Sequence, residues 1–156
     1  MQTIIKTLIV GLILTVGTSV ASAADAVVGT WKLNVAKSTF SPGPAPKSQT
    51  RTYAESAQGI TLTVKTTSAD GKESTASVTF KSDGKSYPMS GNPDFDAVSV
   101  KSADALTVNS VETKAGVNVG TGVRAVSKDG KTLTFTQKGV HADGTKYSDV
   151  LVYDRQ

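Results

Sequence analysis

The chain has 156 residues, of which 38% are hydrophobic, 17 are basic and 13 are acidic, and its formal net charge is +4. This length predicts one domain, and the absence of cysteine excludes a disulfide framework and a lipid anchor on an N-terminal cysteine. Lysines and arginines are spread along the chain, whereas nucleic-acid-binding proteins gather them into a patch, so we expect no nucleic-acid partner.

Residues 1–23 have the pattern of a secretory signal peptide. Lys6 precedes the apolar run TLIVGLILTVG, and Ala21 and Ala23 form an A-x-A cleavage pattern. The apolar run is shorter than the ~20 residues that a membrane span needs, and no basic stop-transfer flank follows it. We therefore predict an exported, monomeric protein, periplasmic or extracellular. Its mature part is a single domain of residues 24–156 without an integral membrane span.

Most of the mature chain alternates apolar and polar residues with a period of two, and β-branched residues dominate it. In the segment GITLTVKTT, Ile60, Leu62 and Val64 share one face, as in a half-buried strand. The same alternation recurs at 72–81, 104–113, 116–127, 131–139 and 146–155. No segment shows a sustained helical period with caps, so the sequence predicts an all-β fold.

Four Asp-Gly pairs begin at residues 70, 83, 129 and 143, between alternating segments, which is typical of tight hairpin turns. The count is about ten short strands joined in sequence. An open meander of this length leaves two edge strands, and closure removes them. We therefore predict an antiparallel up-and-down meander closed into a barrel of about 8–10 strands, with a two-sheet sandwich as the alternative.

Two segments rich in proline and glycine interrupt the alternation. Residues 36–50 contain three of the five prolines and are predicted to connect the first and second strands in an extended form. Residues 86–96 (SYPMSGNPDFD) form a second loop. Such loops either shape ligand access at a barrel mouth or are plain surface crossovers.

The first strand carries the only tryptophan. Strand parity turns Trp31 inward near one end of the barrel, and Gly29 lets another segment approach the backbone. Gly29-Thr30-Trp31, the meander and a final strand with Arg155 together resemble the calycin superfamily of lipocalins and fatty-acid-binding proteins. The ordered set GTWKLN, FSPGPAP, GNPD and VSKDGKTLT resembles small exported bacterial lipocalin-like proteins. This resemblance implies that Arg155 packs over Trp31 and closes the barrel floor.

Candidate ligand-binding residues lie on the last and second strands. Tyr147, Asp149 and Tyr153 share one face of the last strand, and if inward they make a partly polar interior suited to a small amphipathic ligand. The opposite register turns them outward. Arg51 shares a face with Tyr53 and lines either the cavity or its rim.

The fatty-acid-binding resemblance also implies an Arg-x-Tyr carboxylate clamp on the last strand. Residues 151–153 read Leu-Val-Tyr, so the tyrosine is present and the arginine is not. Fatty-acid specificity is therefore not carried over. Arg124 lies opposite Val123 and is predicted to point outward, and we expect both Arg51 and Arg124 to be exposed because arginine is seldom buried without a partner.

Catalytic and metal-ligating patterns are weak. His141, the only histidine, precedes a turn and is predicted to be an exposed loop residue without companion ligands. Asp94 and Asp96 are predicted to form a turn. We expect no enzyme activity, no cofactor and no metal.

The function predicted from sequence is an exported lipocalin-like barrel that binds a small hydrophobic or amphipathic molecule. A structural or interaction protein of the cell envelope with a filled core is the alternative. A barrel-type isomerase or cyclase, working through tyrosine or carboxylate groups in a cavity, is the third hypothesis.

Overall fold

The computed structural model describes residues 25–156, so the predicted signal peptide lies outside the described residues. Within that range the chain forms ten strands and one short 3-10 helix, η1 (Val35–Lys37). The strands are β1 (Gly29–Leu33), β2 (Ser48–Ser56), β3 (Gly59–Thr67), β4 (Glu73–Phe80), β5 (Asp83–Pro88), β6 (Ala97–Ser102), β7 (Thr107–Lys114), β8 (Val117–Val126), β9 (Thr132–Val140) and β10 (Lys146–Arg155). The predicted all-β class and strand number are confirmed. In residues 25–156 no helix has the length and apolar character to cross a membrane.

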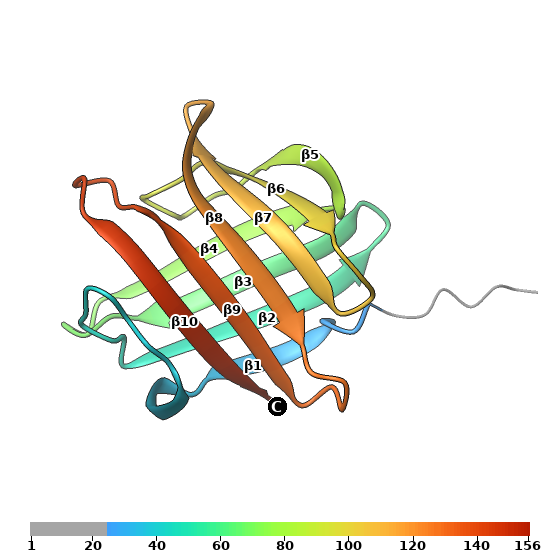
Figure 1. The fold of residues 1–156 in the computed structure, drawn as a ribbon, viewed down its shortest axis with the longest axis horizontal. Helices are drawn as coiled ribbons and strands as arrows, with labels where there is room; N and C mark the ends of the chain where they lie inside the picture. Colours follow the sequence, from blue (N-terminus) through green and yellow to red (C-terminus); the bar gives the residue numbers. More distant parts are fainter. Residues whose placement is uncertain (1–24) are drawn as a thin grey trace, which may run out of the picture.

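All ten strands belong to one antiparallel sheet in the order β4-β3-β2-β1-β10-β9-β8-β7-β6-β5. Figure 1 shows β7–β10 crossing in front of β1–β4, so the sheet curves around an interior. The seam left open lies between β4 and β5. It is bridged by Ser77 and Ser90, whose backbone N–H groups donate to each other's carbonyls at 3.0 and 2.9 Å. The meander is therefore a nearly closed barrel and not a sandwich.

Three of the Asp-Gly pairs form the predicted turns, between β3 and β4, β8 and β9, and β9 and β10. In the first, the Gly71 N–H donates to the Ser68 carbonyl at 2.9 Å, and the Asp70 carboxylate accepts from the Lys72 N–H at 3.1 Å. Gly71 has a φ of 91°, a region that favours glycine. The repeated local sequence thus produces a repeated local geometry.

The fourth pair, Asp83-Gly84, was predicted as a hairpin turn and lies instead inside β5. Asp83 already pairs with Lys101 of β6, and the register shifts between Asp83 and Ser86. Gly84 has a φ of 79°, so it allows an irregularity within the strand. Asp-Gly by itself does not distinguish a turn from a bulge, because both need a residue with positive φ.

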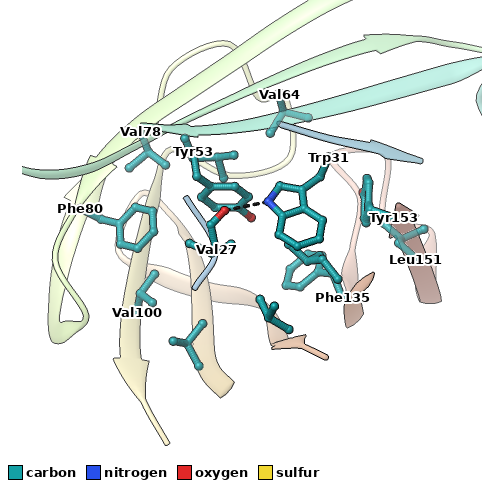
Figure 2. Packing of buried hydrophobic residues seen from close by; sticks show 14 of the residues in the cluster. Val27, Trp31, Tyr53, Val64, Val78, Phe80, Val100, Phe135, Leu151 and Tyr153 are labelled. Carbon is teal, nitrogen blue, oxygen red and sulfur yellow. Dashed lines mark hydrogen bonds between the residues drawn. The ribbon is translucent and has the colours of Figure 1, made fainter. Parts of the chain in front are cut away.

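Trp31 lies in the closed end of the barrel. Its side chain is fully buried, and its indole N–H donates to the Val27 carbonyl at 2.7 Å, as Figure 2 shows. Val27 is also completely buried. The segment before β1 therefore folds under the indole and seals this end, while the hydrogen bond satisfies the single polar group of the tryptophan.

Arg155 covers the indole from the other side. Its guanidinium carbon lies 4.1 Å from the Trp31 ring centroid. The guanidinium donates to the backbone carbonyls of Ala26, Val28 and Gly130, with the Val28 bond at 2.8 Å. One side chain thus ties the segment before β1, the β8–β9 turn and the end of β10 together.

Gly29 makes room for this arginine. A Cβ at Gly29 would stand 2.7 Å from the Arg155 Nη1 atom, and the glycine has a φ of +134°. Any other residue would therefore meet both a steric and a conformational penalty at this position.

Replacing Arg155 with Met is expected to lower the free energy of unfolding by about 2–4 kcal/mol, because charge-assisted hydrogen bonds and the cation–π contact are lost together. Arg155→Lys keeps the charge but cannot reach three carbonyls, so it should recover at most about half of this loss. Urea denaturation measures both variants. An unfolding midpoint unchanged in Arg155→Met would contradict the closing role of this residue.

Candidate functional site

The barrel encloses a cavity of about 220 Å³. Its apolar wall comes from the inward faces of β3, β4, β6 and β7 and includes Leu62, Val64, Val78, Val98 and Val108. These are the positions that the period-two pattern turns to one face. The interior is therefore not the filled core on which the structural alternative depended.

Arg124 is buried, with only 6% of its surface exposed, and it lines the cavity. The prediction that it points outward was wrong. β8 turns Gly120, Gly122, Arg124 and Val126 inward, whereas Val123 on the other face is 43% exposed. The valines suggested the core face, but the barrel needs small residues on this strand because large side chains from neighbouring strands fill the space.

The buried guanidinium of Arg124 is incompletely satisfied. Its carbon lies 5.1 Å from the Tyr53 ring centroid, a cation–π contact, while its Nε–H is buried and has no hydrogen-bond partner. An unsatisfied buried donor costs about 1–3 kcal/mol. This unpaired donor therefore destabilises the folded protein, and it belongs to a residue that lines the cavity.

Arg51 lies near Arg124 in the lining of the same cavity and is held by aromatic residues. Its guanidinium carbon is 4.5 Å from the Phe135 ring centroid, and its Nε–H donates to the Tyr153 hydroxyl at 3.1 Å. Its Nη1 atom is 3.5 Å from the Tyr53 hydroxyl. Arg51 is only partly exposed, so its expected exposure at the surface is corrected to a cavity position. Aromatic faces and hydroxyls replace the carboxylate partner that a buried arginine usually needs.

Glu112 of β7 is a third charged residue in the lining, and it is 4% exposed. The Ser110 hydroxyl donates to its Oε1 atom at 2.7 Å, while Oε2 is buried without a partner. Burial raises the pKa of the Glu112 carboxyl. Sequence reasoning missed Glu112 as a candidate.

Glycines on β8 and β9 create the space for these side chains. A Cβ on Gly120 would stand 3.0 Å from both Glu112 Oε2 and the Tyr147 hydroxyl oxygen. A Cβ on Gly122 would be 2.5 Å from a Phe135 ring carbon. Gly120 and Gly122 alternate along β8, and such a pattern indicates a face that lies against large side chains of neighbouring strands. Because Arg124 shares this face, the pattern could have predicted that Arg124 points inward.

The last strand adopts the register that turns its tyrosines inward. Tyr147 and Tyr153 are buried, whereas Val150 is 39% exposed. Of these two tyrosines, Tyr147 lines the cavity and Tyr153 does not. Tyr153 lies behind Arg51, and its hydroxyl donates to Gln49. Asp149 accepts from the Ser41 N–H and the Gln137 amide, so its carboxylate joins segments and does not face the cavity.

A pair of residues from two loops lies at the rim. The His141 Nδ1 atom is 2.9 Å from Asp94 Oδ2, and the imidazole centroid is 4.5 Å from that of Tyr147. His141 lies in a loop, as predicted, with 41% of its side chain exposed, and Asp94 is a partner that the sequence did not suggest. Asp96 accepts from the Ala115 N–H at 3.0 Å. The two aspartates therefore tie separate loops together.

The two proline-containing loops have different roles. Residues 91–95 line the cavity. Residues 36–47 do not, and run beside β10, where Thr39 forms an isolated bridge with Val150. Access to the cavity is therefore shaped by the loop after β5. Within residues 25–156 no group of three or more histidine, cysteine or acidic side chains could hold a metal ion.

Two solved structures resemble this barrel. A zebrafish ileal bile acid-binding protein complexed with cholic acid matches over 84% of this chain and 99% of that chain, with 11% identity and a TM-score of 0.49. The siderocalin Ex-FABP matches over 84% of this chain and 74% of that chain, with 13% identity and a TM-score of 0.40. No family model matches the chain, and no curated protein matches it.

The raised pKa of Glu112 makes stability depend on pH. The folded state keeps its proton at pH values where the unfolded carboxyl, with its ordinary pKa of 4.5, has lost it. This contribution to stability is therefore full below the unfolded pKa and is lost as the pH rises through the folded pKa. Glu112→Gln should raise the free energy of unfolding at neutral pH relative to wild type, and the difference should shrink in acid.

Urea denaturation from acid to neutral pH measures this difference. Glu73→Gln, an exposed glutamate on β4, is the matched control and should leave the pH profile unchanged. A Glu112→Gln profile parallel to wild type would contradict a raised pKa at Glu112.

Proposed function

We propose that this protein binds a compact amphipathic molecule with an anionic group inside the barrel. The observation that carries the proposal is the buried Arg124 guanidinium, whose Nε–H has no partner at the edge of an apolar cavity. A rotation of the Arg124 side chain toward the cavity would bring this donor to a ligand acceptor, and the valine- and leucine-lined wall would cover the apolar part of the ligand.

The two arginines of the cavity favour an anion beside them, while the acidic residues of the lining, Glu112 and Asp94, lie farther along the wall and at the rim. Arg51 and Arg124 bring two guanidinium groups, the cationic group of arginine, into one lining. The ion pairs of residues 25–156 are Lys37–Asp154 and His141–Asp94, and neither contains a cavity arginine. A carboxylate can accept two parallel hydrogen bonds from one guanidinium, which is among the stronger polar contacts in proteins.

The size of the cavity limits the ligand. A volume of about 220 Å³ lies below the roughly 300–1,000 Å³ of most small-molecule pockets. A medium-chain or single-ring carboxylate fits this volume better than a large polycyclic molecule. The signal-peptide prediction adds that binding takes place outside the cytoplasm, in the periplasm or the extracellular medium.

Native purification followed by mass spectrometry of an organic extract tests whether the barrel carries such a molecule. Enrichment of a compact organic acid is expected. An extract without enriched compounds, together with no calorimetric binding of medium-chain carboxylates, would overturn the proposal.

Arg124→Met should weaken binding of a medium-chain carboxylate by about 10- to 100-fold, because a charge-assisted hydrogen bond is lost. The uncharged alcohol of the same length should lose much less. Isothermal titration calorimetry measures both ligands. Lys101→Met removes an exposed positive charge from β6 and is the control for general electrostatics. Equal weakening by both variants would place the anion outside the cavity.

A further inference from the structure

Glu112 lies at a different level of the barrel from Arg124. Glu112 pairs with Gly120 across β7 and β8, whereas Arg124 pairs with Val108. These positions are four residues apart on β8, about 13 Å of extended strand. Arg124 therefore lies toward the closed floor and Glu112 farther along the wall, where the charge of Arg51 still acts on its carboxyl.

The carboxylate of Glu112 has spare hydrogen-bonding capacity. Ser110 uses Oε1, and neither arginine lies within ion-pair distance among the residues that the structure describes. Oε2 has no partner, although leaving a buried polar atom unpaired is costly. The terminal torsion of glutamate is broad, so the carboxyl can turn toward the cavity without moving the strand.

Tyr147 supplies a second polar atom at the same place. Its hydroxyl oxygen and Glu112 Oε2 both lie 3.0 Å from the point where a Cβ on Gly120 would stand. Gly139 is equally restricted, since its Cβ would be 2.8 Å from the same hydroxyl. Burial, with Glu112 next in importance, raises the pKa of Tyr147 to about 12, so the phenol stays protonated at neutral pH. Two glycines thus leave room for one acceptor and one hydroxyl.

We propose that Glu112 and Tyr147 form a second polar subsite, which binds a hydrogen-bond donor on the ligand. Resting on the proposed function, this defines the ligand class as bipolar: an acidic group meets Arg51 and Arg124, and a hydroxyl or amino group at the other end meets Glu112. The apolar part between them lies against the valine and leucine wall. Plain monocarboxylates satisfy only one of the two ends.

Calorimetry with matched pairs tests this subsite. Medium-chain carboxylates are compared with the ω-hydroxy and ω-amino carboxylates of the same chain length. The ω-substituted ligand of suitable length should bind about 3- to 10-fold more tightly than its parent, because one hydrogen bond is gained. A preference for the amine over the hydroxyl shows an ionised Glu112, and the reverse preference shows the protonated acid.

Variants assign the effect to Glu112. Glu112→Leu should abolish the difference in affinity between the ω-substituted ligand and its parent carboxylate, whatever change in affinity the two ligands share. Glu112→Gln should keep a hydroxyl preference and lose an amine preference. Glu73→Leu, exposed on β4, is the control. Circular dichroism establishes that each variant is folded, and retention of the full preference in folded Glu112→Leu would overturn the subsite.

The outcomes separate the two proposals. If parent carboxylates bind and Arg124→Met weakens them, but no ω-substituent improves affinity, the second subsite is excluded and the proposed function stands. If neither parents nor ω-substituted ligands bind, the proposed function itself fails.

Discussion

The antiparallel pairing of β1 with β10 joins the two ends of the folded chain, with Trp31 opposite Arg155 in the register. Without this pairing the sheet would divide into β1–β4 and β5–β10, and β1 and β10 would become exposed edge strands. The guanidinium stacked on the indole also reaches the segment before β1 and the β8–β9 turn. The same contacts therefore close the barrel floor and enclose the cavity.

Side chains from the strands beyond the floor fill the barrel interior. The small residues of β8 determine how much of that interior stays empty. Gly120 and Gly122 contribute no side-chain volume, so Phe135, Tyr147 and Glu112 extend into the space beside them. The same strand carries Arg124 inward. A barrel with valines on this face would be apolar and more tightly filled. Glycines thus allow a polar interior at the expense of packing.

The polar interior contains buried groups without hydrogen-bond partners. Structural networks of buried polar groups are usually satisfied throughout, because each unpaired group destabilises the fold. Here Arg124 Nε and Glu112 Oε2 lack partners at two levels of one cavity, while Arg51 is held by aromatic faces and hydroxyls. These two unpaired atoms support the proposal of a bound molecule with polar groups at both ends.

The sequence predicted the features that depend on local backbone conformation. Alternation predicted the strands and the inward residues of β3 and β4, and Asp-Gly predicted three turns, because these features depend on backbone conformation and side-chain period alone. The side chain of Trp31 was placed inward for the same reason. The face of β8 was predicted wrongly and the register of β10 stayed open, since both faces of each strand have a plausible hydrophobic pattern.

Only the tertiary structure decided those faces, because the choice depends on what the neighbouring strands place opposite. Phe135 and Tyr147 fill the space beside the β8 glycines, so Arg124 turns inward and Val123 outward. The partnership of His141 with Asp94 likewise joins loops 47 residues apart in the sequence. The sequence by itself determined an antiparallel ten-stranded meander, whereas the polarity of its interior follows from contacts between distant strands.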